Sequence, residues 1–375
     1  MITATIRQCI WEKYTALRGR VRPVLIPYNA KDMAYDLVTL GEAMLRLTAR
    51  HETRLEQAAQ FDAHIGGAEF NVACGAARLG LRTAWVSRLP ENPLGRMARN
   101  HARLHGVETR HLAWSQTERL GLYFVEAGAA PRASGVLYDR ALSALSACQA
   151  SDFDWPSVLA GARGFHVTGI TPALGPGPAE AAAAALRLAR HSGCFTSYDL
   201  NYRRKLWTPE AARAVQEPLM EYVDLLITNE EDAQVVFGIS AGGGKDERYA
   251  HRLEPKHYES VARQLSERFG FQAVAITLRG SPSVWRNHWS GAIFAEGRFH
   301  AAPEFTLEVV DRIGGGDAFA AGLLAARLTG KDWADSVSFA AAYSALKHSL
   351  PGDVNWASRE ETEALLQGAS LRVAR

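Results

Sequence analysis

The chain has 375 residues, which is long for one compact core and favours one large domain with an appendage, or two domains. Hydrophobic residues make up 47% and charged residues 22%, as in an ordinary soluble globular protein. A formal net charge of +2 gives no indication of binding to nucleic acid or to an anionic membrane surface. No apolar run approaches the roughly 20 residues that span a bilayer.

The four cysteines lie far apart and form no C-x-x-C pair and no zinc-like spacing with histidines. The sequence therefore predicts neither a zinc site nor a disulfide framework, and a cytoplasmic location is the simpler expectation. Residues 1–33 carry mostly basic charges and lack both an apolar leader core and a small-residue cleavage site. We interpret them as an N-terminal extension outside the main fold.

From residue 35 on, short apolar runs alternate with longer helical patterns. Several runs are almost continuous hydrophobics, as expected of strands that are covered on both faces. The alternation predicts an α/β fold with a mostly parallel sheet and helices on both sides. The expected strands are 35–41, 83–89, 164–170, 195–201, 222–229 and 272–278, and the expected helices are 69–79, 93–105, 179–191, 209–221, 257–269, 317–328 and 333–348.

Two regions interrupt this alternation. Residues 46–64 and 112–140 are short mixed segments that are better suited to antiparallel hairpins, and their spacing predicts a small β-layer projecting from the main sheet. Residues 238–256 are polar and without periodicity, which predicts a loop.

The stretch "EVVDRIGGGDAFAAGLLAA", residues 308–326, places three glycines before an aspartate and an apolar helix. The amides of Gly314, Gly315, Gly316 and Asp317 would converge at a helix N-terminus, which is a natural anion site. Asp317 would face a phosphate there, so a general base that deprotonates an attacking hydroxyl explains it. The alternative is that Asp317 only caps the helix.

A second glycine turn, "HIGGAEFNVACGAARLG" at residues 64–80, leads into another expected helix. Gly66 and Gly67 precede this helix, and Asn71 lies early enough in it to face a ligand bound over the turn. Taken alone, the pattern favours a plain strand-to-helix turn, and it gains weight only beside the later glycine–aspartate motif.

Together, "GGAEFNVACGAARLG" and "DRIGGGDAFAAG" resemble the two signatures of the ribokinase-like (PfkB) carbohydrate kinase family over residues 35–367. The resemblance implies a three-layer α/β kinase domain at 34–370, a β lid over the sugar, ATP as phosphoryl donor and Mg²⁺. The late signature usually reads D-T-x-G-A-G-D. Here Arg312 stands for the threonine and Gly315 for the alanine.

Further segments are similar to members of the family that act on the sugar acid 2-keto-3-deoxygluconate: "SRLPENPLGRMA", "GITPALG", "DLNYRRKLW" and "KHSLPGDVNW". Arg203 follows the end of an expected strand, where ligands of α/β proteins bind, and its planar fork suits a carboxylate. By this resemblance the sugar-contacting residues are Gly67, Tyr123, Tyr138, Arg140, Arg203 and Asp353, with Asp317 as the base.

The metal and nucleotide residues follow from the same resemblance. The family pattern N-x-x-E organises Mg²⁺ and phosphate; Asn229 fits it, Asp232 stands for the glutamate, and Glu230 lies between them. An acidic helix N-terminus without a metal role is the alternative. Thr277, Arg279 and Gly280 lie where the family places its nucleotide loop, and Leu278 takes the place of a frequent lysine.

The sequence thus predicts an ATP-dependent kinase for a sugar acid, with 2-keto-3-deoxygluconate as the expected substrate and a homo-oligomer as the expected assembly. A fructokinase-like or other sugar kinase is one alternative, and a non-catalytic sugar- or nucleotide-binding regulator is the other. The sequence does not distinguish the gluco from the galacto configuration of the substrate.

Overall fold

The computed structural model describes residues 34–50, 53–240, 255–280 and 283–368. A compact unit of the chain begins at Tyr35. The predicted extension at 1–33 and most of the predicted loop at 238–256 lie outside the described residues. Within the described ranges no helix combines the length and the apolar character needed to cross a membrane.

Within the described residues the central sheet has ten strands in the order β13-β12-β11-β10-β9-β8-β1-β4-β5, with β14 paired to β12. Neighbouring strands from β5 to β11 are parallel, which confirms the mostly parallel sheet, whereas β12, β13 and β14 join as antiparallel strands. The strands are β1 (Leu37–Leu40), β4 (Thr83–Pro90), β5 (Leu112–Ser115), β8 (Gly164–Thr168), β9 (Phe195–Asp199), β10 (Leu225–Thr228), β11 (Ala273–Gly280), β12 (Arg286–Ala295), β13 (Arg298–Ala301) and β14 (Phe305–Glu308).

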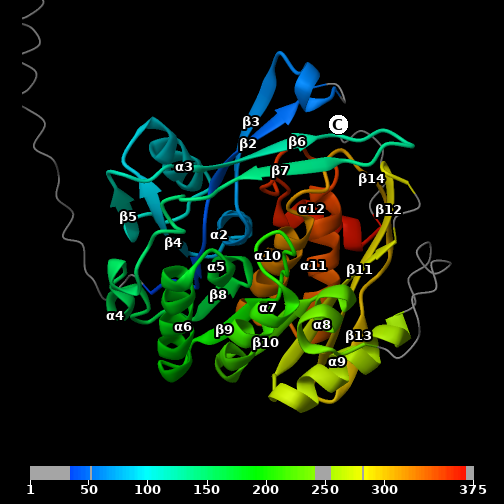
Figure 1. Cartoon of the computed structure of the whole chain (residues 1–375). Helices are drawn as coiled ribbons and strands as arrows, with labels where there is room; N and C mark the ends of the chain where they lie inside the picture. The colour runs from blue at the N-terminus through cyan, green and yellow to red at the C-terminus, as the bar shows by residue number, and fades with distance from the viewer. Residues whose placement is uncertain (1–33, 51–52, 241–254, 281–282, 369–375) are drawn as a thin grey trace, which may run out of the picture. The chain divides into compact units, whose positions relative to one another are not determined.

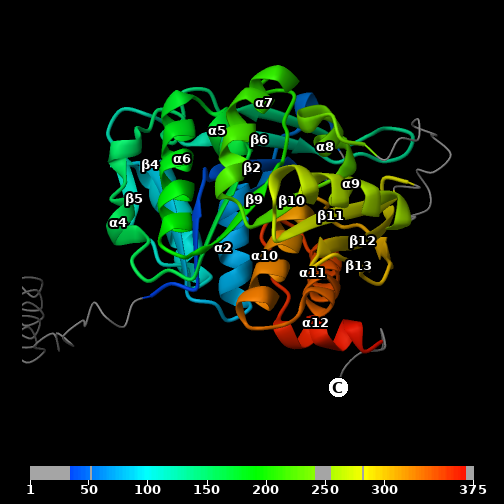
Figure 2. The same ribbon diagram turned by 90° about the horizontal axis from the view of Figure 1, so that it is seen from below.

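Helices cover both faces of this sheet (Figures 1 and 2). One face carries α2, α10 and α11, with α12 packed on α11, and the other carries α6 to α9. The expected helix at 209–221 is divided into α7 and a 3-10 turn at Glu217–Tyr222. The helices are α2 (Ala68–Arg78), α3 (Pro93–Leu104), α4 (Trp155–Val158), α5 (Ile170–Ala173), α6 (Pro176–His191), α7 (Pro209–Gln216), α8 (Glu230–Phe237), α9 (Pro255–Phe269), α10 (Gly315–Leu328), α11 (Trp333–Lys347) and α12 (Arg359–Leu366).

Small residues let α10 lie very close to its two neighbours. A Cβ added to Gly75 of α2 would lie 2.9 Å from the Cβ of Ala321, and one added to Gly322 would lie 3.0 Å from the Cα of Ala340. Larger side chains at these places would push the helices apart. The close packing therefore brings the start of α2 and the start of α10 together at one end of the sheet.

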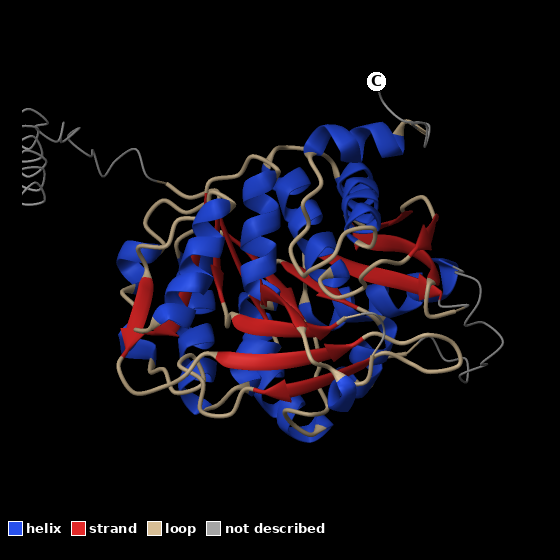
Figure 3. Ribbon diagram, turned by 90° about the horizontal axis from the view of Figure 1, so that it is seen from above, coloured by secondary structure: helices blue, strands red, loops and turns tan. Residues whose placement is uncertain are grey.

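A separate small sheet has the order β3-β2-β6-β7, with β2 (Met44–Ala49), β3 (Phe61–Gly66), β6 (Gly121–Glu126) and β7 (Gly135–Asp139). Its strands cross the molecule in the view from above (Figure 3). The projecting β-layer is thus present. The expected antiparallel pairs are β2–β3 and β6–β7, and the two pairs are joined by a parallel pairing of β2 with β6.

The predicted lid segment 112–140 is divided between the two sheets. Its first part, β5, pairs with β4 at the edge of the central sheet, and only β6 and β7 belong to the small sheet. Alternation of polar and apolar residues is the same in both places, because an edge strand of the main sheet is also half exposed.

Candidate active site

Asp317 lies in the first turn of α10, which begins after a left-handed residue. Gly314 is the N-cap with φ 84°, and a Cβ there would lie 2.0 Å from the carbonyl oxygen of Asp353. The amide of Gly315 already donates to the carbonyl of Arg312 at 3.3 Å, whereas the amides of Gly316 and Asp317 open the helix, where no intrahelical acceptor exists. A Cβ at Gly316 would meet nothing within 4 Å. The helix start is therefore an open anion-binding turn, with the amides of Gly316 and Asp317 as its main donors.

Gly315 is explained by the histidine behind it. A Cβ at this position would lie 2.7 Å from Cε1 and 2.8 Å from Nε2 of His348. The His348 ring is fixed because its Nδ1 lies 2.8 Å from the carbonyl of Ser344 and its ring packs on Trp289. Burial lowers the pKa of His348 to about 4, as expected of a neutral structural histidine. The alanine that is usual at position 315 in the family would collide with this ring.

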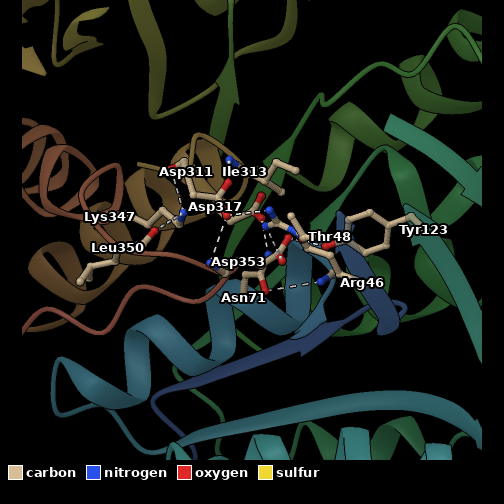
Figure 4. Close-up of polar contacts among 12 residues, drawn as sticks. Arg46, Thr48, Asn71, Tyr123, Asp311, Ile313, Asp317, Lys347, Leu350 and Asp353 are labelled. Carbon is tan, nitrogen blue, oxygen red and sulfur yellow. Dashed lines mark hydrogen bonds and ion pairs between the residues drawn. The ribbon is translucent and has the colours of Figure 1, made fainter. Parts of the chain in front are cut away.

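The two glycine-rich motifs meet through one hydrogen bond. The Nδ2 of Asn71, in the first turn of α2, donates to Oδ2 of Asp317 at 2.7 Å (Figure 4). Desolvation raises the pKa of Asp317 to about 6, against the bond from Asn71 and the charge of Arg203, which lower it. A carboxylate with this pKa is ionised at neutral pH and is also a competent proton acceptor.

A buried ionic network fixes the loop before α10. Arg46 of β2 is 2% exposed; its NH2 lies 2.7 Å from Oδ2 of Asp311 and its NH1 lies 3.2 Å from Oδ1 of Asp353. Lys347, which is fully buried, donates from Nζ to the carbonyls of Asp311 (3.0 Å) and Leu350 (3.2 Å). These contacts join the small sheet, the 311–316 turn and the end of α11 (Figure 4).

The predicted sugar-side residues gather under the small sheet. The hydroxyl of Tyr123 donates to Oδ2 of Asp353 at 2.5 Å, and its ring stacks on Tyr138 with centroids 5.7 Å apart. A Cβ at Gly66 would lie 2.5 Å from Cγ of Asp353, and one at Gly67 would lie 1.9 Å from the carbonyl oxygen of Glu42. Both glycines are thus required by close approach of the chain.

Arg140 is paired in a way that the sequence did not predict. Its NH2 forms an ion pair with Glu42, which is 4% exposed. The Nε of Arg140 and Oε1 of Glu42 are nonetheless buried without a hydrogen-bond partner among the described residues. The pair therefore keeps one donor and one acceptor for a further polar group.

Arg203 follows the carboxyl end of β9. It has no ion pair among the described residues, and its charge acts on three carboxylates by lowering the pKa of Asp199, Asp232 and Asp317. Desolvation and the charges of Asp317 and Asp232 nevertheless hold the pKa of Asp199 well above its ordinary value. Among the cations, Arg203 thus lowers the pKa of the expected base most, followed by Lys347.

The predicted metal residues form the start of α8. Asn229 is its N-cap and accepts the amide of Asp232 at 2.8 Å. Asp232 is buried, and its Oδ2 accepts the amide of Tyr202 at 3.0 Å, while Glu230 is only partly buried. No group of three or more His, Cys, Asp or Glu that could hold a metal occurs in the described ranges.

The predicted nucleotide residues lie at the end of β11. Thr277 and Arg279 alternate with Leu278, which stands in the place of the family's frequent lysine and is fully buried in the core. The guanidinium of Arg279 lies over the ring of Trp289 at 5.7 Å.

Five residues of the site were missed: Glu42, Arg46, Asp199, Asp311 and Lys347. The only sequence signal for Arg46 and Lys347 is a cation inside an otherwise apolar run, "AMLRLTA" and "AYSALKH". His166 and His348 are buried, and burial lowers their pKa to about 3 and about 4, as for neutral histidines.

The chain matches a known protein family. The model described as pfkB family carbohydrate kinase matches residues 34–358. The chain is 34% identical over 343 residues to a 2-dehydro-3-deoxygalactonokinase of Haloferax volcanii, which covers 92% of this chain and 100% of that protein. It is 30% identical over 336 residues to a 2-dehydro-3-deoxygluconokinase of Thermoproteus tenax, with 88% and 94% covered. A solved 2-dehydro-3-deoxygluconokinase from Thermotoga maritima matches with a TM-score of 0.84 and 44% identity, over 88% of this chain and 99% of that one.

Proposed function

Because the chain belongs to the pfkB family of carbohydrate kinases, we propose that it phosphorylates 2-keto-3-deoxygluconate (2-dehydro-3-deoxygluconate) with ATP, giving the 6-phosphate. The observation that carries the proposal is the bond from Asn71 to Asp317, which unites the two signature motifs around one desolvated carboxylate. The names of the relatives from Thermoproteus tenax and Thermotoga maritima support the sugar acid as substrate.

Asp317 is the proposed general base. It accepts the proton of the attacking hydroxyl while the oxygen of that hydroxyl bonds to the γ-phosphorus of ATP. The amides of Gly316 and Asp317, with the turn from Gly314 to Gly315, stabilise the negative charge of the transferring group. The N-cap of α10 is Gly314 and not Asp317, which supports the general-base proposal over simple capping.

Arg203 and Arg140 are the proposed partners of the sugar acid, with Tyr123 and Tyr138 beside them. Arg203 has no ion pair among the described residues, so its fork is available to a carboxylate. Arg140 shares its charge with Glu42, and its spare Nε suits a hydroxyl or one carboxylate oxygen. Asp353 and Gly66 lie next to Tyr123, because a Cβ at Gly66 would lie 2.5 Å from Cγ of Asp353 and 2.7 Å from the hydroxyl of Tyr123, and Gly67 follows directly.

ATP and Mg²⁺ are proposed as phosphoryl donor and counter-ion, and the donor set fits such a metal. Magnesium keeps several waters and uses few protein ligands, so the lack of a three-ligand cluster among the described residues is compatible with it. Glu230 and Asp232, at the start of α8, would hold it through water, and bound Mg²⁺ would neutralise phosphate charge. Asn229, Thr277, Arg279 and Gly280 are the proposed nucleotide contacts.

The galacto-configured sugar acid is a second candidate substrate, because the relative from Haloferax volcanii carries the galactonokinase name. Production of ADP should be measured with the two epimeric acids, fructose and ribose. Turnover of either acid at a kcat/KM at least about tenfold above that of the neutral sugars supports the proposal, since that ratio corresponds to about 1.4 kcal/mol. Preference for fructose or ribose supports a hexose or pentose kinase, and no ADP release with any sugar supports a non-catalytic regulator.

We further propose that the protein is a homo-oligomer in the cytoplasm. The edge strand β7 exposes Leu137 (56%) and Tyr138 (38%), and we propose that a second copy covers this edge in a homo-oligomer. Cys74, Cys148 and Cys194 are buried free thiols, which is compatible with a reducing cytoplasm. Light scattering of the purified chain, with Leu137→Glu as the disrupting variant, tests the assembly.

A further inference from the structure

Arg312 stands where the family usually has a threonine, and the chemistry described so far does not use it. Its NH2 lies 3.4 Å from the carbonyl oxygen of Val284 and 3.5 Å from Oδ1 of Asn287. Both contacts are at the long limit of a hydrogen bond, so they use little of the capacity of a guanidinium. Asn287 itself is 1% exposed, and its Nδ2 has no hydrogen-bond partner among the described residues.

Arg312 is one of three neighbouring arginines that lack a carboxylate partner. Arg203, Arg279 and Arg312 have no ion pair in the part of the chain that the structure describes, whereas Arg46 and Arg140 of the same site do. Desolvation lowers the pKa of Arg279, and the charges of Arg312 and Arg203 lower it further. Three cations that repel one another at one place need an anion to balance them.

The position of Arg312 selects the kind of anion. The residue lies two positions before Gly314, the N-cap of the anion-binding turn, and its guanidinium reaches Val284 and Asn287 at the start of β12. It thus lies between the place of the transferring group and the β11–β12 end that holds the predicted nucleotide residues. An anion that spans these two places carries charge along a chain, as a polyphosphate does.

We propose that Arg312 and Arg279 together bind the β-phosphate of the nucleotide, the leaving group of the transfer. The identity of the nucleotide rests on the proposed function. In the reaction the bond between the γ-phosphorus and the β–γ bridging oxygen breaks, and the electron pair stays on the diphosphate. A new bond forms from the sugar oxygen to the γ-phosphorus, and the proton of the hydroxyl passes to Asp317. Two guanidinium forks at the diphosphate offset the charge that develops there.

The threonine that is usual at position 312 cannot do this, because it has neither charge nor reach. Arg312 therefore supplies a cation from the same loop as the start of α10, where the family signature has a neutral residue. A merely structural role would instead consist of the two long contacts to Val284 and Asn287, which tie the 311–316 turn to β12.

The test compares binding of MgADP and AMP to the full chain by titration calorimetry, in wild type, Arg312→Gln and Arg312→Lys. AMP lacks the β-phosphate, so the ratio of the two affinities isolates the group that Arg312 is proposed to bind. Arg298→Gln is the matched control, because Arg298 is an exposed arginine on β13, away from this end of the sheet. Melting temperatures of all variants verify that they are folded.

We expect Arg312→Gln to weaken MgADP by about 10-fold or more, as for loss of a charged hydrogen bond, and AMP by less than about twofold. Arg312→Lys should retain part of the preference for ADP, and Arg298→Gln should retain all of it. Equal weakening of ADP and AMP, no weakening of either, or a wild type that does not bind ADP would overturn the inference. A clear loss of ADP preference in a chain that phosphorylates no sugar acid would keep the inference and overturn the proposed function.

Discussion

Substitution of Asn71 by alanine tests whether the bond between the two motifs controls the ionisation of the base. The amide of Asn71 donates to Asp317 at 2.7 Å and opposes the desolvation that raises the pKa of Asp317 to about 6. A hydrogen bond to a charged group is worth about 1.5–3 kcal/mol, and 1.36 kcal/mol corresponds to one pKa unit. In the variant the pKa of Asp317 should therefore rise to about 7–8.

Asn71→Ala is expected to lower kcat/KM most at acidic pH. Asp317 acts as a base only when ionised, so kcat/KM falls as the pH drops through its pKa, and a higher pKa moves this fall to higher pH. At pH 6.5 the ionised fraction is about 0.76 for a pKa of 6 but between about 0.24 and 0.03 for a pKa of 7 to 8. Asn71→Ala should thus lose about 3- to 25-fold in kcat/KM at pH 6.5 and recover at pH 9.

The assay is coupled ADP production with both substrates across pH 5.5–9. Cys74→Ala is the control, since Cys74 is fully buried one turn further along α2 and no described contact links it to Asp317. Comparison with wild type at each pH removes the ionisation of the substrates themselves. If Asn71→Ala is slower by the same factor at every pH, the acid limb has not moved, and Asn71 does not act through the ionisation of Asp317.

Three further predictions concern substitutions of Asp317, Arg203 and Gly315. Asp317→Asn should keep sugar and nucleotide binding but lose about 10²–10⁴-fold in turnover, and near-normal kcat would exclude it as the base. Arg203→Ala should weaken the sugar acid far more than fructose in the KM values, and equal weakening would contradict a carboxylate-binding role. Gly315→Ala should lower the unfolding free energy by about 1–3 kcal/mol because its Cβ meets His348. Denaturant unfolding of Gly315→Ala, His348→Ala and the double variant should show coupling of the two sites, whereas additive losses would refute the contact.

The parts of the molecule that are local in sequence were predicted well. Gly314 and Gly67 precede helices, and buried parallel strands appear in the sequence as apolar runs. The parallel strands, the helix starts and the position of Asp317 at a helix start can therefore be predicted from short stretches. The antiparallel edge was missed because its first strand, β12, begins with polar residues after a loop. Likewise, β5 was assigned to the wrong sheet because an edge strand alternates like a lid strand.

The buried ionic network could not be predicted, for a different reason. Arg46 and Asp353 are separated by 307 positions, and nothing near either residue in the sequence specifies the other. The same holds for Glu42, whose partner Arg140 is 98 positions away. Such pairs follow only from the way the two sheets and α11 pack, which single-sequence patterns do not contain.

Asp353 links the small sheet to the start of α10 through its side chain and its main chain. Its carboxylate is held by Tyr123 and Arg46 of that sheet, while its carbonyl lies against Gly314 at the start of α10. The base of the small sheet is thereby anchored to the catalytic turn by a buried ion pair, so it cannot swing away as a rigid flap without breaking that pair. A change at Tyr123 would accordingly disturb capture of the sugar and placement of the transferring group at once.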